Sequence, residues 1–431
     1  MKYYSTNKDS PLVNFKEATI KGQAPDKGLY FPEYIPQVEK DLIDNIENFS
    51  KNDIAFRVLQ PYVSGSIPDD NLFEIVTETI NFPITLVKIN ETVFSLELFH
   101  GPTLAFKDVG ARFMSRCLGY FMKSENKKVT VLVATSGDTG GAVANGFYNV
   151  DEVDVIILYP SGKVSPVQEK QLTTLEKNIH AIEVEGTFDD CQQMVKQAFA
   201  DTEINKRLFL TSANSINIAR WLPQQIYYFF AYKQWKDKDD PPVISVPSGN
   251  FGNICAGILA MISGLPVKHF IAACNANDIV TKYLESQKLE PKKAIPTLSN
   301  AMDVGDPSNF VRILEIFDND FNKLKKNLSS YSFTDQQTLM AIEKIYTQYK
   351  YLADPHGAIG YLALEKYVNN NPGSKGIFLE TAHHVKFPEA LEKISGKKIE
   401  IPEQLSDLMK KEKKAIRMQP DYKELKDHLL Q

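Results

Sequence analysis

The stretch that says most about the fold is VTVLVATSGDTGG, residues 129–141. Its first five residues form a run of leucine and β-branched side chains, which is typical of a strand buried on both faces. Gly137, Gly140 and Gly141 then lead through a polar turn into an apolar segment with helical periodicity. A buried strand followed by a turn and a helix is the repeating unit of parallel α/β sheets.

The same unit recurs after residues 129–141. Ser165, Pro166 and Gln168 predict the start of a helix, because they match a serine N-cap, a proline in the first turn and the partner residue of a capping box. A long apolar helix is predicted over residues 216–235. Further strands are predicted at 153–158, 207–210, 243–246 and 376–379. This alternation predicts an α/β fold with parallel sheets.

The length of 431 residues allows two or three packed units, at about 150 residues each. Residues 1–90 are polar and turn-rich, and they show no sustained alternation of strands and helices. We therefore expect an N-terminal unit at residues 1–90, a first α/β domain at 91–210 and a second α/β domain at 211–431.

Composition excludes several classes of protein. With 43% hydrophobic and 24% charged residues, the chain can bury a core and is not intrinsically disordered. The net charge of -5 is mild, and the charges are too well mixed to suggest a surface that binds a polyanion, so a dedicated nucleic-acid binder is not expected. Its four cysteines contain no Cys-x-x-Cys pair, which argues against a disulfide framework, a thiolate zinc site or an iron–sulfur cluster. We expect no metal site.

The sequence also lacks the signals of export and membrane insertion. The first residues carry no unbroken apolar run of the kind that a signal peptide needs. The most apolar internal stretch, residues 254–267, is shorter than the roughly 20 residues that span a bilayer. We therefore expect a cytoplasmic protein.

Ligands of open parallel sheets bind outside the carboxyl ends of the strands, so the loops there are candidate sites. One such loop is PSGNFGN, residues 247–253. Its glycines let the backbone approach a ligand closely, and N–H groups at a helix start can wrap a phosphate. An ordinary tight turn would have the same composition. Neither a Walker A spacing nor a Gly-x-Gly-x-x-Gly follows any predicted strand, which disfavours nucleotide and dinucleotide binding.

Two further segments could carry chemistry. Residues 134–141 place hydroxyls and a carboxylate at a helix start, which suits a substrate carboxylate, although Ser136 or Asp138 could simply be the N-cap. In HGPTLAFKDVGARFM, residues 100–114, Lys107 follows an apolar neighbour. Burial would lower the pKa of this lysine and make its neutral amine a nucleophile. Taken alone, a surface lysine paired with Asp108 is the simpler interpretation.

Six separated motifs together resemble the threonine synthase family. The likeness extends over nearly the whole chain, includes residues 4–6 and 28–32 near the N-terminus, and is closest to the longer bacterial and fungal branch. The six motifs lie at residues 100–103 with 105–108, 135–140, 212–220, 247–253, 301–305 with 307–310, and 381–383.

This resemblance implies an enzyme of the fold type II class that depends on pyridoxal 5'-phosphate, with a tryptophan synthase β-like architecture. Such lyases convert O-phospho-L-homoserine and water into L-threonine and phosphate. By likeness, Lys107 would hold the cofactor covalently and move protons at the substrate. Thr381 would offer its hydroxyl to the ring nitrogen. The cofactor phosphate would be bound by Gly249, Asn250, Phe251, Gly252 and Asn253.

The resemblance also assigns substrate contacts. Ser136, Asp138 and Thr139 would bind the α-carboxylate, although many relatives carry asparagine at the position of Asp138. Ser215 and Arg220 would bind the substrate phosphate at the start of the helix expected from residue 216. A surface ion pair is the alternative for this arginine. The histidines His383 and His384 fit a loop-shaping role better than acid–base catalysis.

Several alternatives to this function remain at this point. A phospho-lyase on the same scaffold would release 2-oxobutyrate, and a threonine or serine dehydratase would have no use for a second anion site. A non-catalytic metabolite sensor would keep the fold without turnover. The sequence is compatible with a monomer or a homodimer.

Overall fold

The computed structural model describes residues 1–125 and 127–431. Its contacts group the chain into two compact units. Unit 1 consists of residues 1–30, 107–220 and 401–431, and unit 2 consists of residues 31–106 and 221–400. The expected domain boundaries, 1–90, 91–210 and 211–431, remain a prediction, because a grouping by contacts does not test which segments act as domains.

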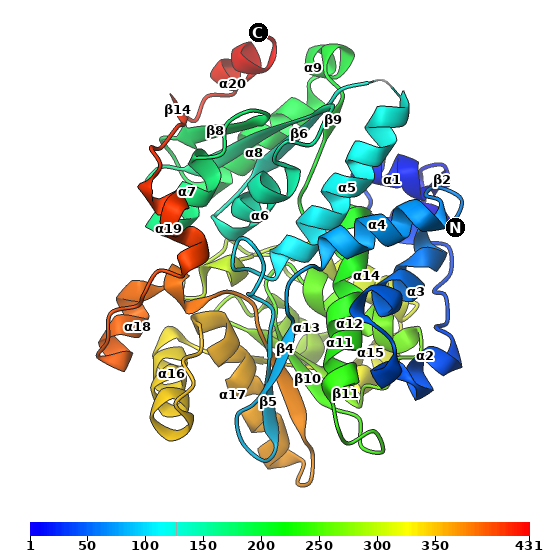
Figure 1. Cartoon of the computed structure of the whole chain (residues 1–431), viewed down its shortest axis with the longest axis vertical. Helices are drawn as coiled ribbons and strands as arrows, with labels where there is room; N and C mark the ends of the chain where they lie inside the picture. The colour runs from blue at the N-terminus through cyan, green and yellow to red at the C-terminus, as the bar shows by residue number, and fades with distance from the viewer. Residues whose placement is uncertain (126) are drawn as a thin grey trace. The chain divides into compact units, whose positions relative to one another are not determined.

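Unit 1 is built on a five-stranded sheet in the order β14-β8-β7-β6-β9, with every neighbouring pair parallel (Figure 1). The strands are β6 Val129–Ala134, β7 Val153–Pro160, β8 Ile179–Val184, β9 Leu210–Thr211 and β14 Ile416–Met418. The N-terminal β1 Lys2–Ser5 and β2 Val13–Asn14 pair antiparallel in a separate three-stranded sheet of order β2-β1-β3, in which β3 is Tyr30–Pro32. The parallel sheet predicted from residues 129–141 is therefore confirmed.

Helices of unit 1 begin where the sequence supplies caps. In α7, the Ser165 amide donates to Gln168 Oε1 at 3.0 Å and the Gln168 amide donates to Ser165 Oγ, as the capping box predicts. The helices of the unit are α1 Phe15–Lys21, α5 Lys107–Glu125, α6 Asp138–Phe147, α7 Pro166–Thr173, α8 Phe188–Ala200, α9 Thr202–Arg207, α19 Glu403–Lys410 and α20 Tyr422–Leu429. Leucines of α20 and apolar residues of α8 join the core cluster of this sheet.

Unit 2 contains a six-stranded sheet in the order β12-β11-β10-β13-β5-β4. All neighbours are parallel except β4 and β5, which pair antiparallel at one edge. The strands are β4 Thr85–Lys88, β5 Val93–Glu97, β10 Val243–Pro247, β11 His269–Cys274, β12 Leu328–Ser332 and β13 Gly376–Glu380. The predicted strands at 243–246 and 376–379 are thus confirmed.

The longer helices of unit 2 include α17, which packs on β13, β10 and β11. The core on that side joins apolar residues of α16 and α17 to the buried strands. The helices are α2 Lys40–Asp44, α3 Lys51–Val63, α4 Asp69–Thr79, α11 Gln225–Gln234, α12 Gly252–Ile262, α13 Ile279–Ser286, α14 Phe310–Ile316, α15 Phe321–Asn327, α16 Asp335–Tyr349, α17 Pro355–Asn370 and α18 Pro388–Ser395.

Two sequence predictions were wrong in detail. The strand expected at 207–210 is β9, Leu210–Thr211, because residue 207 still belongs to α9, which begins after its N-cap Asp201 and ends at Arg207. The single helix expected over 216–235 is broken into α10 Ile218–Trp221, a 3₁₀ turn Leu222–Gln224 and α11. Pro223 lies in that turn, and proline lacks the N–H group that a continuous helix requires.

Among the described residues, no helix is both long enough and apolar enough to cross a bilayer.

Candidate active site

The loop between β10 and α12 has the geometry of an anion-binding turn. Its start is held by the Ser248 amide, which donates to the Ala273 carbonyl at 2.8 Å. Asn253 Nδ2 donates back to the Pro247 carbonyl at 2.8 Å and closes the loop. Phe251 is left-handed, with φ of 62°, directly before the first turn of α12. The N–H groups of a first helical turn have no acceptor within the helix, so they can bind an oxyanion.

Only glycine fits at position 249, because the backbone of residues 301 and 302 packs directly against this loop. A Cβ atom there would lie 2.6 Å from Met302 Cα and 3.1 Å from the Ala301 carbonyl oxygen. The following Asn250 is tied to another segment, because its Oδ1 accepts the Ser308 amide at 2.7 Å. The motif at 301–310 therefore supports the loop at 247–253, and the two motifs form one structural feature of unit 2.

Thr381 directly follows β13 and is 5% exposed. Its carbonyl accepts the Phe106 amide at 2.9 Å, and Ala105 pairs with Ala382 as an antiparallel bridge. Lys107 follows Phe106 in the chain and is the first residue of α5. The backbone of Thr381, whose side chain is the candidate hydroxyl, is thus hydrogen-bonded to Phe106, the residue before Lys107.

In unit 1, the loop between β6 and α6 is organised by Thr135. Its Oγ1 accepts the amides of Gly137 at 3.0 Å and Gly140 at 2.8 Å. The N-cap of α6 is Gly137, at φ of 134° and without a side-chain cap. The alternative that Ser136 or Asp138 caps this helix is therefore wrong, since a threonine two residues earlier serves the turn. Thr139, in the first turn, is half-buried.

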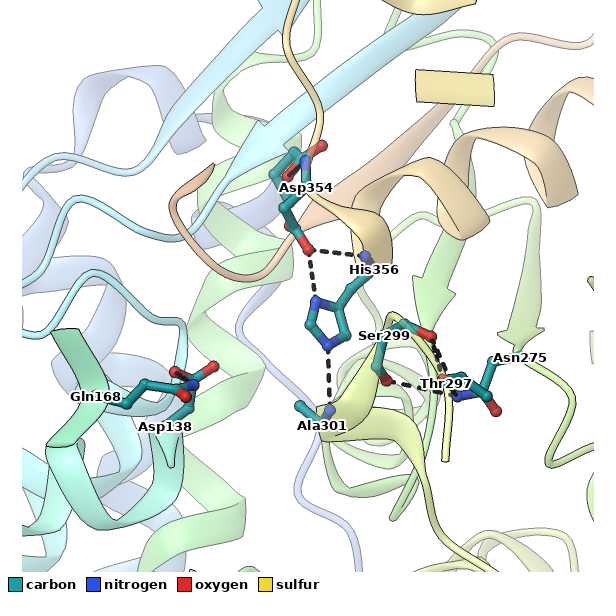
Figure 2. A network of polar contacts seen from close by, with 9 residues as sticks. Asp138, Gln168, Asn275, Thr297, Ser299, Ala301, Asp354 and His356 are labelled. Carbon is teal, nitrogen blue, oxygen red and sulfur yellow. Dashed lines mark hydrogen bonds and ion pairs between the residues drawn. The ribbon is translucent and has the colours of Figure 1, made fainter. Parts of the chain in front are cut away.

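Asp138 is buried, with 6% of its surface exposed, and is paired with an amide. Its Oδ1 accepts from Gln168 Nε2 at 3.0 Å (Figure 2). The amide group of Gln168 lies over Gly137, where a Cβ atom would meet Gln168 Cδ at 2.5 Å. A carboxylate that accepts an N–H hydrogen bond can remain ionised beside another anion.

Arg220 is 3% exposed, so it is not the surface arginine of the alternative interpretation. Its Nη1 donates to the carbonyl of Ala213, and its backbone is approached closely by Gly110. Ser215 is half-buried in the turn before α10. The expectation of a long helix start beside these two residues is wrong, because α10 has only four residues. Any anion site here depends on the hydroxyl and the guanidinium.

The described structure therefore groups the predicted residues in two sets. Unit 1 contains Lys107, Ser136, Asp138, Thr139, Ser215 and Arg220, and unit 2 contains Thr381 with Gly249, Asn250, Phe251, Gly252 and Asn253. The structure shows no group of three or more metal-ligating side chains among the residues that it describes.

The histidines after Thr381 are held in a half-buried cluster. Burial, together with His384, His100 and Lys386, lowers the pKa of His383 to about 3. His383 Nδ1 accepts the Val385 amide at 3.1 Å, which caps a short 3₁₀ turn. A neutral acceptor that shapes the loop agrees with the structural role expected from the sequence.

Sequence reasoning missed three buried side chains near these elements: Asp354, His356 and Glu380. Asp354 caps α17, and its Oδ1 lies 2.5 Å from His356 Nδ1. The sequence did carry one signal, since an aspartate directly before proline is a typical helix N-cap. The pairing with Glu380 had none, because the two segments are joined only by folding.

Comparison with known proteins identifies the family. Three family models match the chain: "Threonine synthase N terminus" at residues 2–80, "Pyridoxal-phosphate dependent enzyme" at 76–378 and "Threonine synthase, C-terminal" at 357–429. The threonine synthase of Haemophilus influenzae is 42% identical over 431 residues and is covered completely, as is this chain. That of Escherichia coli is 43% identical over 94% of both chains.

The chain belongs to the threonine synthase family.

Solved structures of the family agree over the full length. The crystal structure of the Escherichia coli threonine synthase matches with a TM-score of 0.93 and 40% identity, covering 100% of this chain and 99% of that one. A threonine synthase from Brucella melitensis with bound pyridoxal phosphate matches with a TM-score of 0.92 and 35% identity, covering 100% and 98%. Maize serine racemase, at a TM-score of 0.55 and 16% identity, shares the fold.

These comparisons confirm the fold type II α/β architecture and the dependence on pyridoxal phosphate. The residues of unit 2 fit that cofactor. The loop at 247–253 leaves no space for a side chain at Gly249 and presents first-turn amides suited to a phosphate. Thr381 supplies a buried hydroxyl next to the segment that leads into Lys107.

Proposed function

We propose that this chain uses pyridoxal phosphate to convert O-phospho-L-homoserine and water into L-threonine and phosphate. The observation that carries the proposal is the hydrogen bond from the Phe106 amide to the Thr381 carbonyl. It anchors the residue before Lys107 to the segment that supplies the candidate hydroxyl. Lys107 begins a helix directly after this anchored residue, so the backbone position from which its side chain extends is fixed.

Bound pyridoxal phosphate supplies an electron sink for carbanions. Lys107 holds the cofactor and moves protons at Cα and Cβ of the substrate. The backbone amides of Gly249 to Asn253 would bind its phosphate, and the Thr381 hydroxyl would face the ring nitrogen. Because that hydroxyl carries no charge, it does not force a proton onto the ring nitrogen.

The substrate contacts lie in unit 1. Ser136 and Thr139 bind the α-carboxylate through their hydroxyls and Asp138 through its backbone N–H group at the start of α6, while the hydrogen bond from Gln168 holds the aspartate side chain in place. Ser215 and Arg220 bind the substrate phosphate. The arginine is suited to this task because a buried guanidinium offers several N–H groups to a dianion at a fixed angle.

Product analysis tests the reaction. Incubation of the holoenzyme with O-phosphohomoserine should release threonine and phosphate in equal amounts. Release of 2-oxobutyrate would instead identify a phospho-lyase, and no turnover by cofactor-loaded protein would identify a metabolite sensor.

The role of Lys107 is tested by absorbance. Lys107→Ala should lose the near-ultraviolet or visible band of lysine-bound cofactor, and an unchanged spectrum would contradict the assignment. Replacement of Lys123, which is exposed in the last turn of the same helix, provides the control.

We also propose a cytoplasmic location and a small-molecule substrate as the main partner, without nucleic acid. The acidic balance of the chain argues against a nucleic-acid partner, and its cysteine usage supports a reducing compartment. Cell fractionation would test the location. Light scattering would distinguish a monomer from a homodimer.

A further inference from the structure

A chain of hydrogen bonds runs through the interior of unit 2 (Figure 2). The Ala301 amide donates to His356 Nε2 at 3.3 Å, and His356 Nδ1 lies 2.5 Å from Asp354 Oδ1. The Asp354 amide in turn donates to Glu380 Oε2 at 3.3 Å. The side chains of Asp354, His356 and Glu380 are at most 2% exposed.

The hydrogen bonds assign the proton of His356. Because Nε2 accepts the Ala301 amide, it carries no hydrogen, and the proton lies on Nδ1. This hydrogen is donated to Asp354 Oδ1, which also accepts the His356 amide at 2.7 Å. The carboxylate of Asp354 is therefore held by two N–H groups of His356, one from the ring and one from the backbone.

The side-chain carboxyl groups of Asp354 and Glu380 are close enough to interact, and a second proton held between them would join the two. Asp354 Oδ2 and Glu380 Oε1 are buried oxygens with no N–H or O–H donor among the described residues. Two buried carboxylates side by side repel each other, whereas one proton between them satisfies both orphaned oxygens. Burial and the nearby Asp354 raise the pKa of Glu380 well above its usual value. Glu380 is accordingly the protonated member.

The ends of this chain reach the two parts of the cofactor site in unit 2. Ala301 and Met302 form the wall against which Gly249 packs. Glu380 is followed directly by Thr381, and a Cβ atom at Gly357 would lie 2.0 Å from Glu380 Oε1, so this side chain has little space to move. One buried network therefore connects the phosphate loop with the hydroxyl at the other end of the site.

We propose that His356, Asp354 and Glu380 are positioning residues that brace the loop at 249–253 against Thr381 and preorganise the site for pyridoxal phosphate. This inference rests on the proposed cofactor contacts. The brace keeps the phosphate anchor and the ring anchor at one separation, so binding does not have to order them.

Other titratable groups surround the brace. Glu97 and Tyr351 act on Glu380 from neighbouring segments, while His383 and His384 act on Asp354. As pH rises, loss of the shared proton places a second negative charge beside Asp354, and the brace loosens. Affinity for pyridoxal phosphate should then fall at alkaline pH.

The test is titration of the apoprotein with pyridoxal phosphate, followed by fluorescence, for matched variants at several pH values. Glu380→Gln keeps the shape and a donor toward Asp354, so its affinity should stay within about threefold of wild type and lack the alkaline loss attributed to Glu380. Glu380→Leu removes the donor and should weaken binding about tenfold. His356→Asn breaks the chain at the other end and should do the same.

The melting temperature of each apoprotein separates positioning from a general effect on folding. Wild-type affinity and an unchanged pH profile in both Glu380→Leu and His356→Asn would overturn the brace. If Glu380→Leu does not fold, His356→Asn alone decides. Thr381→Val tests the underlying site: if this variant also binds pyridoxal phosphate normally, the proposed contacts are wrong, whereas a loss confined to Thr381→Val refutes the brace alone.

Discussion

At the scale of single residues, the site depends on small groups whose chemistry is set by burial. Gly249 has no room for a methyl group, and His383 stays neutral because its surroundings disfavour a charge. Neither property follows from residue type alone, because glycine and histidine occur in many settings. Both can be tested by a single substitution.

Gly249→Ala should weaken binding of pyridoxal phosphate about tenfold, because the new Cβ would displace the loop from Met302. Titration of the apoprotein measures the change. Gly360→Ala is the matched control, since its Cβ would touch Pro247 at an ordinary 3.4 Å. Equal binding by both variants would show that the loop at 247–253 does not hold the cofactor.

His383 should make the fold sensitive to acid. Its folded pKa of about 3 lies below the ordinary value of 6.5, so the unfolded chain takes up the proton first and stability falls as pH drops below that value. Discounted for partial exposure, the loss at about pH 5 is roughly 1 kcal/mol. Urea unfolding at neutral and acid pH should show a smaller loss for His383→Asn. The same acid loss in both proteins would exclude this histidine as its source.

At the scale of elements, helix starts place side chains in the candidate site. The capping box at Ser165 was predicted from three residues and formed as expected, because capping depends on neighbours along the chain. Its partner Gln168 has a second contact that the motif did not predict, the hydrogen bond to Asp138 on α6. The predicted helix over 216–235 is too long, because the apolar pattern continues across Pro223 although the proline interrupts the helix there.

Gln168→Glu should raise KM for O-phosphohomoserine about tenfold with a smaller effect on cofactor affinity. Glutamate keeps the Oε acceptor for the Ser165 amide but replaces the Nε2 donor toward Asp138 with a negative oxygen. Steady-state kinetics measures KM, and a cofactor titration serves as the control. An unchanged KM would remove Asp138 from the carboxylate site.

At the scale of the whole molecule, unit 1 is assembled from three separated stretches of chain. The last of them adds β14 to the edge of β8 and brings Lys413 to Glu169 and Glu183. The lysine-rich stretch at 410–414 is exposed, but it is helical only as far as Lys410, where α19 ends. Lys413 beyond it is paired with the carboxylate of Glu183, which is 3% exposed.

Lys413→Met should destabilise unit 1 by about 1–3 kcal/mol, because it removes an ion-pair partner from the buried Glu183. Although burial acts to raise the pKa of Glu183, bonds from Lys413 and Ser161 outweigh it and lower this pKa. Denaturant unfolding measures the effect. Lys414→Met is the matched control, since Lys414 and Glu176 are both exposed and their pair should contribute less than about 1 kcal/mol. Equal losses would contradict the role of the buried pair.

The sequence by itself determined the alternation of strands and helices, the loops at the carboxyl ends of β6 and β10, and the six motifs that resemble threonine synthases. These features are local, since periodicity, capping and turn chemistry act over a few residues. Only the tertiary structure decided that Gln168 meets Asp138, that β14 pairs with β8, and that Glu380 lies against Asp354. Such contacts join residues far apart in the chain, and the protonation of a buried carboxyl depends on neighbours that only folding supplies.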